Sequence, residues 1–176
     1  MSGEVAFGCQ ISEHCTCHPG KGRQHAAIVA AGRGESGRVT VDLVWYGHPS
    51  GAVARLAELS EKHDPLAVVV DAGSQSGTLL RPLADAGVWV TSPPVREVAV
   101  AHGEFLDLVQ AGGLEHLDQP PLTAAVRAGQ QRFLAGAQAW DRRGVQTDQS
   151  PVEAATLAVH AFLAWEALSQ PGVWQG

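Results

Sequence analysis

The chain has 176 residues, 45% of them hydrophobic, and a formal net charge of -6 at pH 7. This length is enough for one well-buried domain and too short for two, so we predict a single globular domain over residues 1–176. The net negative charge argues against nonspecific, polybasic adhesion to nucleic acid. It is compatible with a DNA enzyme whose few basic residues surround an acidic metal site.

The sequence also argues against a secreted or membrane protein. No apolar stretch is long enough to span a bilayer, and the N-terminal M-S-G-E-V-A lacks the basic and apolar regions of a signal peptide. The cysteines are odd in number and lie at one end, at Cys9, Cys15 and Cys17, so a disulfide framework is not expected. These features predict a soluble, intracellular protein.

The first third of the chain has the pattern of strands separated by Gly, Pro and Ser. Strands are predicted at Glu4–Ile11, His25–Gly32 and Arg38–Tyr46, and the short link G-R-G-E-S-G between the last two indicates a hairpin. A helix follows, with Ser50 as its N-cap and Asp64 at its end.

The rest of the chain alternates strands and helices. Leu66–Asp71 is apolar at nearly every position, as in a strand covered on both faces, and Val88–Thr91 is predicted as a strand after a helix that ends at Gly87. This alternation predicts an α/β fold with a mixed central sheet and helices on both faces. Further helices are predicted at Val95–Val109, Leu122–Ala135 and Pro151–Leu168, the last of them apolar almost all round and therefore buried.

Asp71 is the first candidate site residue, because it closes a strand at the end where open α/β sheets place their ligand groups. It can be a metal ligand, or a turn aspartate that hydrogen-bonds its own backbone two residues on. The following loop, Gly73–Gly77, is neither a phosphate-binding P-loop nor a serine-hydrolase elbow, because the chain has no G-x-x-x-x-G-K-[ST] motif and the central residue of the loop is Gln75.

Asp148 is the second candidate. It precedes a helix in which Ser150 is the predicted N-cap, Pro151 the first helical residue and Glu153 the partner of a capping box. The capping box gives Glu153 a structural role. The only structural role expected for Asp148 is a modest interaction with the helix dipole, so a metal-ligand role is favoured for it.

Histidines and cysteines give weaker signals. His14, Cys15, Cys17 and His18 supply enough soft ligands for zinc, but their spacing matches no zinc motif, so a surface loop is favoured. For His102 and His116, which could approach an active site, a structural role is the default expectation.

Basic residues gather in the C-terminal third of the chain. Arg127 and Arg132 are expected on one helix, and Arg142 and Arg143 in the turn before Asp148. Guanidinium groups beside a metal–carboxylate site suit a phosphodiester backbone, although a solvated helix face has the same pattern.

Three segments occur in the order V-V-V-D-A-G-S-Q-S-G-T-L-L-R-P-L-A-D-A-G-V, H-L-D-Q-P-P-L-T-A-A-V-R-A-G and D-Q-S-P-V-E-A-A-T-L-A-V-H-A. Together they resemble a known family, the C-terminal nuclease domain of phage terminase large subunits, particularly those of actinobacteriophages. The resemblance implies a ribonuclease H-like fold and a Mg2+- or Mn2+-dependent endonuclease that cuts concatemeric viral DNA, with two metal ions held by three acidic residues. Asp71 and Asp148 match the second and third of these acids.

The first acid does not match. Where the family has F-G-x-D-x-S, this chain has Phe7-Gly8-Cys9-Gln10-Ile11-Ser12, so Gln10 places a neutral amide at the first-strand metal position. Gln10 is consistent with a degenerate nuclease, with Glu13 as a substitute ligand, or with a deliberately altered residue.

The resemblance also implies double-stranded DNA, a terminase ATPase domain, a small terminase and a portal as partners, and the host cytoplasm as the location. The chain has no Walker motif, so it is expected to be an excised domain or a stand-alone relative without motor activity. Three hypotheses follow: a metal-dependent DNA endonuclease, a catalytically silent DNA- or partner-binding module disabled by Gln10, and, more weakly, a zinc module built on Cys15 and Cys17.

Overall fold

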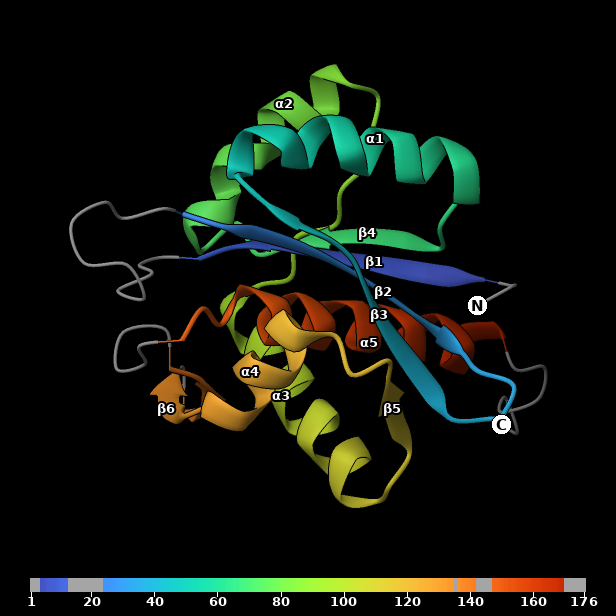
Figure 1. Ribbon diagram of the computed structural model, residues 1–176, viewed down its shortest axis with the longest axis vertical. Helices are drawn as coiled ribbons and strands as arrows, with labels where there is room; N and C mark the ends of the chain where they lie inside the picture. The colour runs from blue at the N-terminus through green and yellow to red at the C-terminus, as the bar shows by residue number, and fades with distance from the viewer. Residues whose placement is uncertain (1–3, 13–23, 135, 142–146, 170–176) are drawn as a thin grey trace, which may run out of the picture.

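A computed structural model describes residues 4–12, 24–134, 136–141 and 147–169 of the protein. Its centre is a five-stranded mixed sheet in the order β4-β1-β2-β3-β5 (Figure 1). The strands are β1 (Val5–Ile11), β2 (Ala26–Arg33), β3 (Val39–Gly47), β4 (Ala67–Val70) and β5 (Leu114–His116).

The pairing of the strands determines which of their ends meet. β1 is antiparallel to β2 and β2 is antiparallel to β3, whereas β4 runs parallel to β1 on the other side, with Cys9 opposite Val70. The ends of β1, β3 and β4 and the start of β2 therefore lie along one edge of the sheet, at the left in Figure 1.

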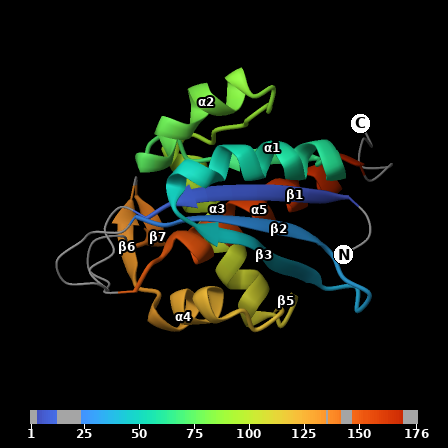
Figure 2. The ribbon, with the colours of Figure 1, turned by 45° about the horizontal axis from the view of Figure 1, so that its top comes forward.

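Helices cover both faces of the sheet, as predicted. Helix α1 (Ala52–His63) and helix α2 (Leu80–Asp85) cover one face, and α3 (Val95–Gln110), α4 (Pro120–Ala128) and α5 (Ser150–Ser169) lie on the other (Figures 1 and 2). Two short 3-10 turns precede α1 and α2, at Pro49–Gly51 and Gln75–Leu79.

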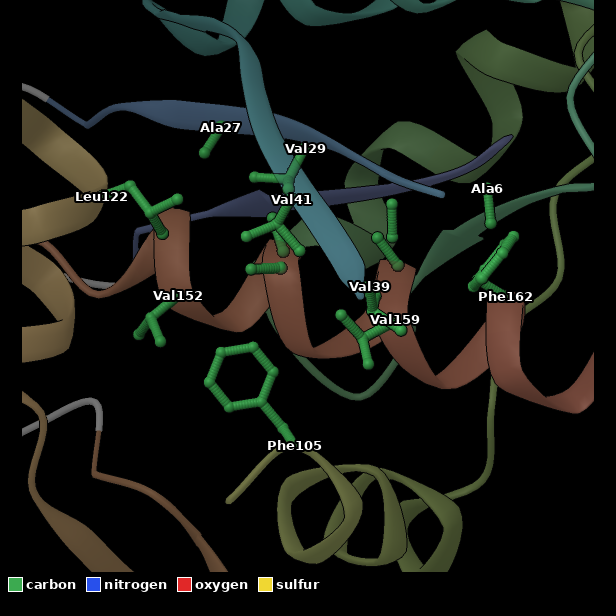
Figure 3. Close-up of a cluster of buried hydrophobic side chains, with 14 of the residues drawn as sticks. Ala6, Ala27, Val29, Val39, Val41, Phe105, Leu122, Val152, Val159 and Phe162 are labelled. Carbon is green, nitrogen blue, oxygen red and sulfur yellow. The ribbon is translucent and has the colours of Figure 1, made fainter. Parts of the chain in front are cut away.

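Helix α5 is the buried helix that its apolar sequence predicts. Its side chains lie between the sheet and α3, and Phe105 of α3 packs on the side away from the strands (Figure 3). The helix approaches β1 so closely that a Cβ added at Gly8 would come within 2.0 Å of the Ala154 carbonyl oxygen. Glycine at this position therefore permits the contact between helix and strand.

The structure corrects several sequence predictions. The predicted helix at Leu122–Ala135 ends at Ala128, and a β-hairpin follows, formed by β6 (Gln131–Leu134) and β7 (Ala137–Trp140). The predicted strand at Val88–Thr91 is reduced to a single bridge between Val69 and Thr91.

The start of the first helix is also different from the prediction. Ser50 lies in the 3-10 turn, where its N–H donates to the His48 side chain, and α1 begins after Gly51 without a side-chain cap. Among the described helices, none combines the length and the apolar character needed to cross a membrane.

Candidate active site

Five polar residues lie along the edge of the sheet at which β1, β3 and β4 end. Gln10 is near the end of β1, His25 immediately precedes β2, Tyr46 is near the end of β3, Asp71 directly follows β4, and Asp148 precedes α5. We call this set the polar edge.

Strand alternation directs the polar edge toward α5. Ala6 packs in the cluster around α5 and Gly8 contacts the helix directly, so Gln10, two residues on, faces the same side. By the same alternation His25 shares the face of Ala27, which belongs to that cluster. Side chains from neighbouring strands are therefore directed to one region.

A β-bulge brings Tyr46 to this face. Leu43 pairs with Val29 but Trp45 pairs with Ile28, so one extra residue is inserted into β3 at this point. The bulge shifts the alternation, and Tyr46 therefore packs on the α5 side as Leu43 does, although the two are three positions apart, an odd number. Without the bulge Tyr46 would face α1.

Asp71 is buried, with 5% of its surface exposed. Its Oδ1 accepts a 2.9 Å hydrogen bond from the N–H of Gly73, and its carbonyl oxygen accepts a 2.8 Å hydrogen bond from the Ser74 hydroxyl. The turn role considered from the sequence is thus present. It does not compete with a metal-ligand role, because a carboxylate has about four lone-pair sites and this turn uses one of them.

Gln10 is fully buried and lies beside Asp71 in the continuation of the parallel β1–β4 register. Its Nε2 donates a 3.1 Å hydrogen bond to the Ser74 hydroxyl in the loop after Asp71. Its Oε1 is buried and accepts no hydrogen bond from the described residues. Because an unpartnered buried amide oxygen is costly, this atom is suited to a cation or a water molecule.

Asp148 is held on both carboxylate oxygens. Its Oδ1 accepts a 2.8 Å hydrogen bond from the N–H of Ser150, and its Oδ2 accepts a 2.8 Å hydrogen bond from the Tyr46 hydroxyl. His25 Nδ1 lies 3.4 Å from the same Oδ2. Asp148 is only 7% exposed, so these contacts fix a buried carboxylate at the start of α5.

This arrangement corrects the predicted capping box. Ser150 is the first residue of α5 and its hydroxyl is buried without a hydrogen-bond partner among the described residues, so it does not cap the helix. The carboxylate of Asp148 satisfies the N–H of Ser150 instead. The prediction that Asp148 has no structural duty was therefore wrong, and Glu153 is not a capping partner of Ser150.

Tyr46 and His25 were not identified from the sequence. Their rings stack at 4.9 Å between centroids with an interplanar angle of 12°. Burial, and secondarily the charge and hydrogen bond of Asp148, raise the pKa of Tyr46, so its hydroxyl remains a hydrogen-bond donor at neutral pH. The positions of both residues at strand ends were readable from the sequence, but the bulge that turns Tyr46 toward α5 was not.

The donors of the polar edge suit a hard divalent cation. Two buried carboxylates and an unpartnered amide oxygen are oxygen ligands of the kind that Mg2+ and Mn2+ bind. Within residues 4–12, 24–134, 136–141 and 147–169, no three His, Cys, Asp or Glu side chains are grouped so that they could hold a metal ion. The third oxygen donor of the polar edge, Gln10, is a neutral amide.

The predicted basic residues lie on different elements. Arg127 is exposed on α4, whereas Arg132 is half-buried on β6 and donates from Nε to the Trp140 carbonyl oxygen at 3.2 Å. The expectation that they share a helix was wrong. Glu13, Arg142, Arg143 and the loop from His14 to His18 lie outside the described residues.

The two histidines considered from the sequence, His116 and His102, do not belong to the polar edge. His116 pairs with Val41 in the first half of β3, away from the end at which Tyr46 lies. His102 is buried against Trp140 in an edge-on contact of 4.6 Å, and burial lowers its pKa. The structural expectation for His102 agrees with this packing.

Comparison with known proteins gives structural relatives only. No family model and no curated sequence matches the chain. The large terminase of bacteriophage HK97 matches over 92% of this chain with a TM-score of 0.66 and 15% identity. The chain spans only 40% of that protein.

Isolated terminase nuclease domains are matched over most of their length. The nuclease of thermophilic phage G20c with bound magnesium matches with a TM-score of 0.63 and 18% identity, covering 88% of this chain and 79% of that one. The nuclease domain of the bacterial virus Sf6 large terminase, solved with manganese, has a TM-score of 0.56 and 14% identity, covering 90% of this chain and 88% of that one. The chain thus has the fold of phage large-terminase nuclease domains, and the predicted ribonuclease H-like fold class is confirmed.

Proposed function

We propose that this chain is a metal-dependent DNA endonuclease domain of the terminase type, occupying residues 1–176 and cutting concatemeric DNA during viral packaging. The observation that carries the proposal is the placement of two buried carboxylates, Asp71 and Asp148, on one edge of this fold with the unpartnered amide oxygen of Gln10. Burying two carboxylates is costly unless charge or hydrogen bonds compensate them, and a divalent cation is an effective compensation.

In this proposal Asp71, Asp148 and Gln10 would hold Mg2+ or Mn2+. When bound in a two-metal site, such ions activate the attacking water and neutralise charge on the scissile phosphate. The G20c and Sf6 nuclease structures contain magnesium and manganese, respectively, which supports this choice of ions. Glu13, which lies three residues after Gln10 in the sequence, would be the substitute ligand.

The residues of the chain supply the positioning. The N–H of Ser150 and the hydroxyl of Tyr46 fix Asp148, and the N–H of Gly73 fixes one oxygen of Asp71. Preorganised ligands of this kind reduce the rearrangement needed when a cation and DNA bind.

The DNA contacts are proposed for four basic residues of the C-terminal third. Arg127 is exposed on α4, which packs on α5, and is available to a DNA phosphate. Arg132, Arg142 and Arg143 complete the proposed set. By resemblance, the further partners are a terminase ATPase domain, a small terminase and a portal in the host cytoplasm.

The alternative is a catalytically impaired module that keeps the fold and binds DNA or a partner. Gln10 favours it, because a neutral amide at a metal position lowers the negative charge of the site by one unit relative to aspartate. The two functions differ in whether the protein cuts DNA when a divalent ion is supplied.

The decisive experiment is cleavage of supercoiled plasmid with Mg2+, Mn2+ or EDTA. The endonuclease proposal predicts metal-dependent nicking that Asp71→Asn or Asp148→Asn abolishes, whereas Asp85→Asn, at an aspartate with 75% of its side chain exposed, leaves it unchanged. If the unmodified protein does not cleave the plasmid but Gln10→Asp does, the result would support the impaired module. Absence of cleavage by every folded variant would overturn the nuclease proposal.

A further inference from the structure

Several unpartnered polar atoms concentrate at the polar edge. Of the seven buried side-chain nitrogen and oxygen atoms that lack a hydrogen-bond partner among the described residues, four belong to this edge or to the adjoining start of α5. They are Gln10 Oε1, His25 Nδ1, Gln149 Oε1 and Ser150 Oγ. Such a concentration marks a place built for a bound species, because each of these atoms is costly when left alone.

Among these four atoms, His25 Nδ1 belongs to a residue close to Asp148 that is not yet among the proposed metal ligands. It lies 3.4 Å from Asp148 Oδ2, yet the geometry is not that of a hydrogen bond. Two ligand atoms bound to one cation at about 2.1 Å each are separated by roughly 3.0 to 3.4 Å. The spacing therefore fits a nitrogen and an oxygen that share a cation.

Asp148 has the coordination capacity for this arrangement. A carboxylate offers about four lone-pair sites, and the hydrogen bonds from Ser150 and Tyr46 use one on each oxygen. One lone pair on Oδ2 remains for a cation on the side of His25.

The backbone and a neighbouring ring hold His25 in place. Its backbone N–H donates a 2.9 Å hydrogen bond to the Ser12 hydroxyl, and its carbonyl oxygen accepts a 2.8 Å hydrogen bond from the N–H of Ser12. Its ring is stacked on Tyr46, so the imidazole has little room to rotate.

Gln10 is a candidate for a third ligand. It pairs with Ala27 on β2, which makes it a diagonal neighbour of His25 on the same face. Diagonal neighbours of this kind have Cα atoms about 7–8 Å apart, a separation that long side chains bridge. Its unpartnered Oε1 is thus within reach of a cation held by His25 and Asp148.

We propose that His25 Nδ1 and Asp148 Oδ2, with Gln10 Oε1, form a mixed nitrogen–oxygen site for a divalent cation. This inference rests on the proposed metal-dependent function and names a ligand that the sequence resemblance does not supply. Imidazole nitrogen shifts the preference of a site from Mg2+ toward transition metals. Gln10 and His25 then act together as neutral ligands that make Mn2+ the better ion for this chain.

The test is electron paramagnetic resonance of Mn2+ bound to the protein, which detects coupling to a ligating nitrogen. We expect nitrogen coupling in the wild type, its loss in His25→Phe, and its retention in His116→Phe. Phenylalanine preserves the stacking on Tyr46 while removing the nitrogen. Calorimetry should show Mn2+ affinity falling about tenfold or more in His25→Phe, with a smaller change for Mg2+.

The outcomes separate this inference from the proposed function. Mn2+ that binds and supports DNA cleavage without nitrogen coupling, or with coupling that survives in His25→Phe, overturns the inference alone. Failure of the wild type to bind Mn2+ overturns both. If His25→Phe does not fold, isotope-labelled histidine in the wild type decides the matter, because an unchanged coupling pattern would exclude a histidine ligand.

Discussion

The Tyr46 hydroxyl donates a 2.8 Å hydrogen bond to Oδ2 of Asp148, which joins residues 102 positions apart in the chain. The bond connects the end of β3 with the start of α5. Tyr46 faces α5 only because of the bulge in β3. The bulge is therefore needed for the hydrogen bond that positions the Asp148 carboxylate.

Replacing Tyr46 by phenylalanine should therefore affect both stability and metal binding. The loss of one hydrogen bond to a carboxylate is expected to cost about 1–2 kcal/mol of unfolding free energy, measured by urea denaturation. Because Oδ2 of Asp148 then loses the hydrogen bond that orients it, the protein should also bind Mn2+ about tenfold more weakly, as measured by calorimetry. An unchanged Mn2+ affinity would show that the hydroxyl does not position the carboxylate.

Cys9 should make stability pH-dependent at alkaline pH. Burial raises the pKa of its thiol from an ordinary value of 9.0 to about 12. Since the unfolded chain releases this proton first, the contribution to stability is complete below pH 9 and is lost as the pH rises from 9 toward 12. Relative to Cys9→Ala, the parent should lose on the order of 1 kcal/mol per pH unit in that window.

The same burial predicts that the Cys9 thiol is inert in the folded protein. In a Cys15→Ser, Cys17→Ser background, a thiol reagent should react only after denaturant is added. Rapid reaction under native conditions would contradict the burial of Cys9 on β1.

The contact between β1 and α5 predicts opposite effects of alanine at two glycines. At Gly8 the new Cβ would meet the backbone of Ala154 and Ala158 at 2.0 and 2.8 Å, so Gly8→Ala should cost about 3 kcal/mol or more. At Gly103, within α3, an added Cβ meets nothing within 4 Å, so Gly103→Ala should stabilise the protein by about 0.5–1 kcal/mol. Thermal and urea denaturation of both variants test the pair, and similar effects would contradict the packing of α5.

Arg127 and Arg132 should respond differently to replacement by glutamine. Arg127 is exposed, so Arg127→Gln should weaken DNA binding and reduce its dependence on salt concentration without changing the melting temperature. Arg132 bonds the Trp140 carbonyl oxygen across the hairpin, so Arg132→Gln should also lower the melting temperature. Fluorescence anisotropy with duplex DNA at several salt concentrations, beside thermal melts, distinguishes the two.

The first four strands and the buried helix could be predicted from the sequence because local pattern and tertiary environment agree there. β1, β2 and β3 are bounded by turn residues, and α5 is apolar on all sides. The β6–β7 hairpin could not be predicted from the sequence, because the apolar residues after Leu122 keep the spacing of a helix. Its strands are stabilised by packing on α3 and by the bond from Trp140 Nε1 to Thr156 Oγ1, which are distant in sequence.

The candidate site was predictable only in part. The strand-end position of Asp71 and the helix-start position of Asp148 follow from local pattern, and both residues are buried at one edge. The contacts of Asp148 with Tyr46 and His25 depend on strand register and on the bulge, which no local pattern specifies. The S-P-V-E pattern of a capping box predicts Ser150 as the cap of α5, yet the carboxylate of Asp148, two residues before it, accepts the hydrogen bond from the Ser150 N–H.

The most direct test of the central claim is anomalous X-ray diffraction from crystals of the protein soaked in Mn2+. We predict a strong peak at the polar edge, bonded to oxygens of Asp71 and Asp148 and lost in Asp148→Asn. Crystals that bind Mn2+ only at other surfaces, or a peak that survives in both Asp71→Asn and Asp148→Asn, would contradict the assignment of these aspartates to a metal site.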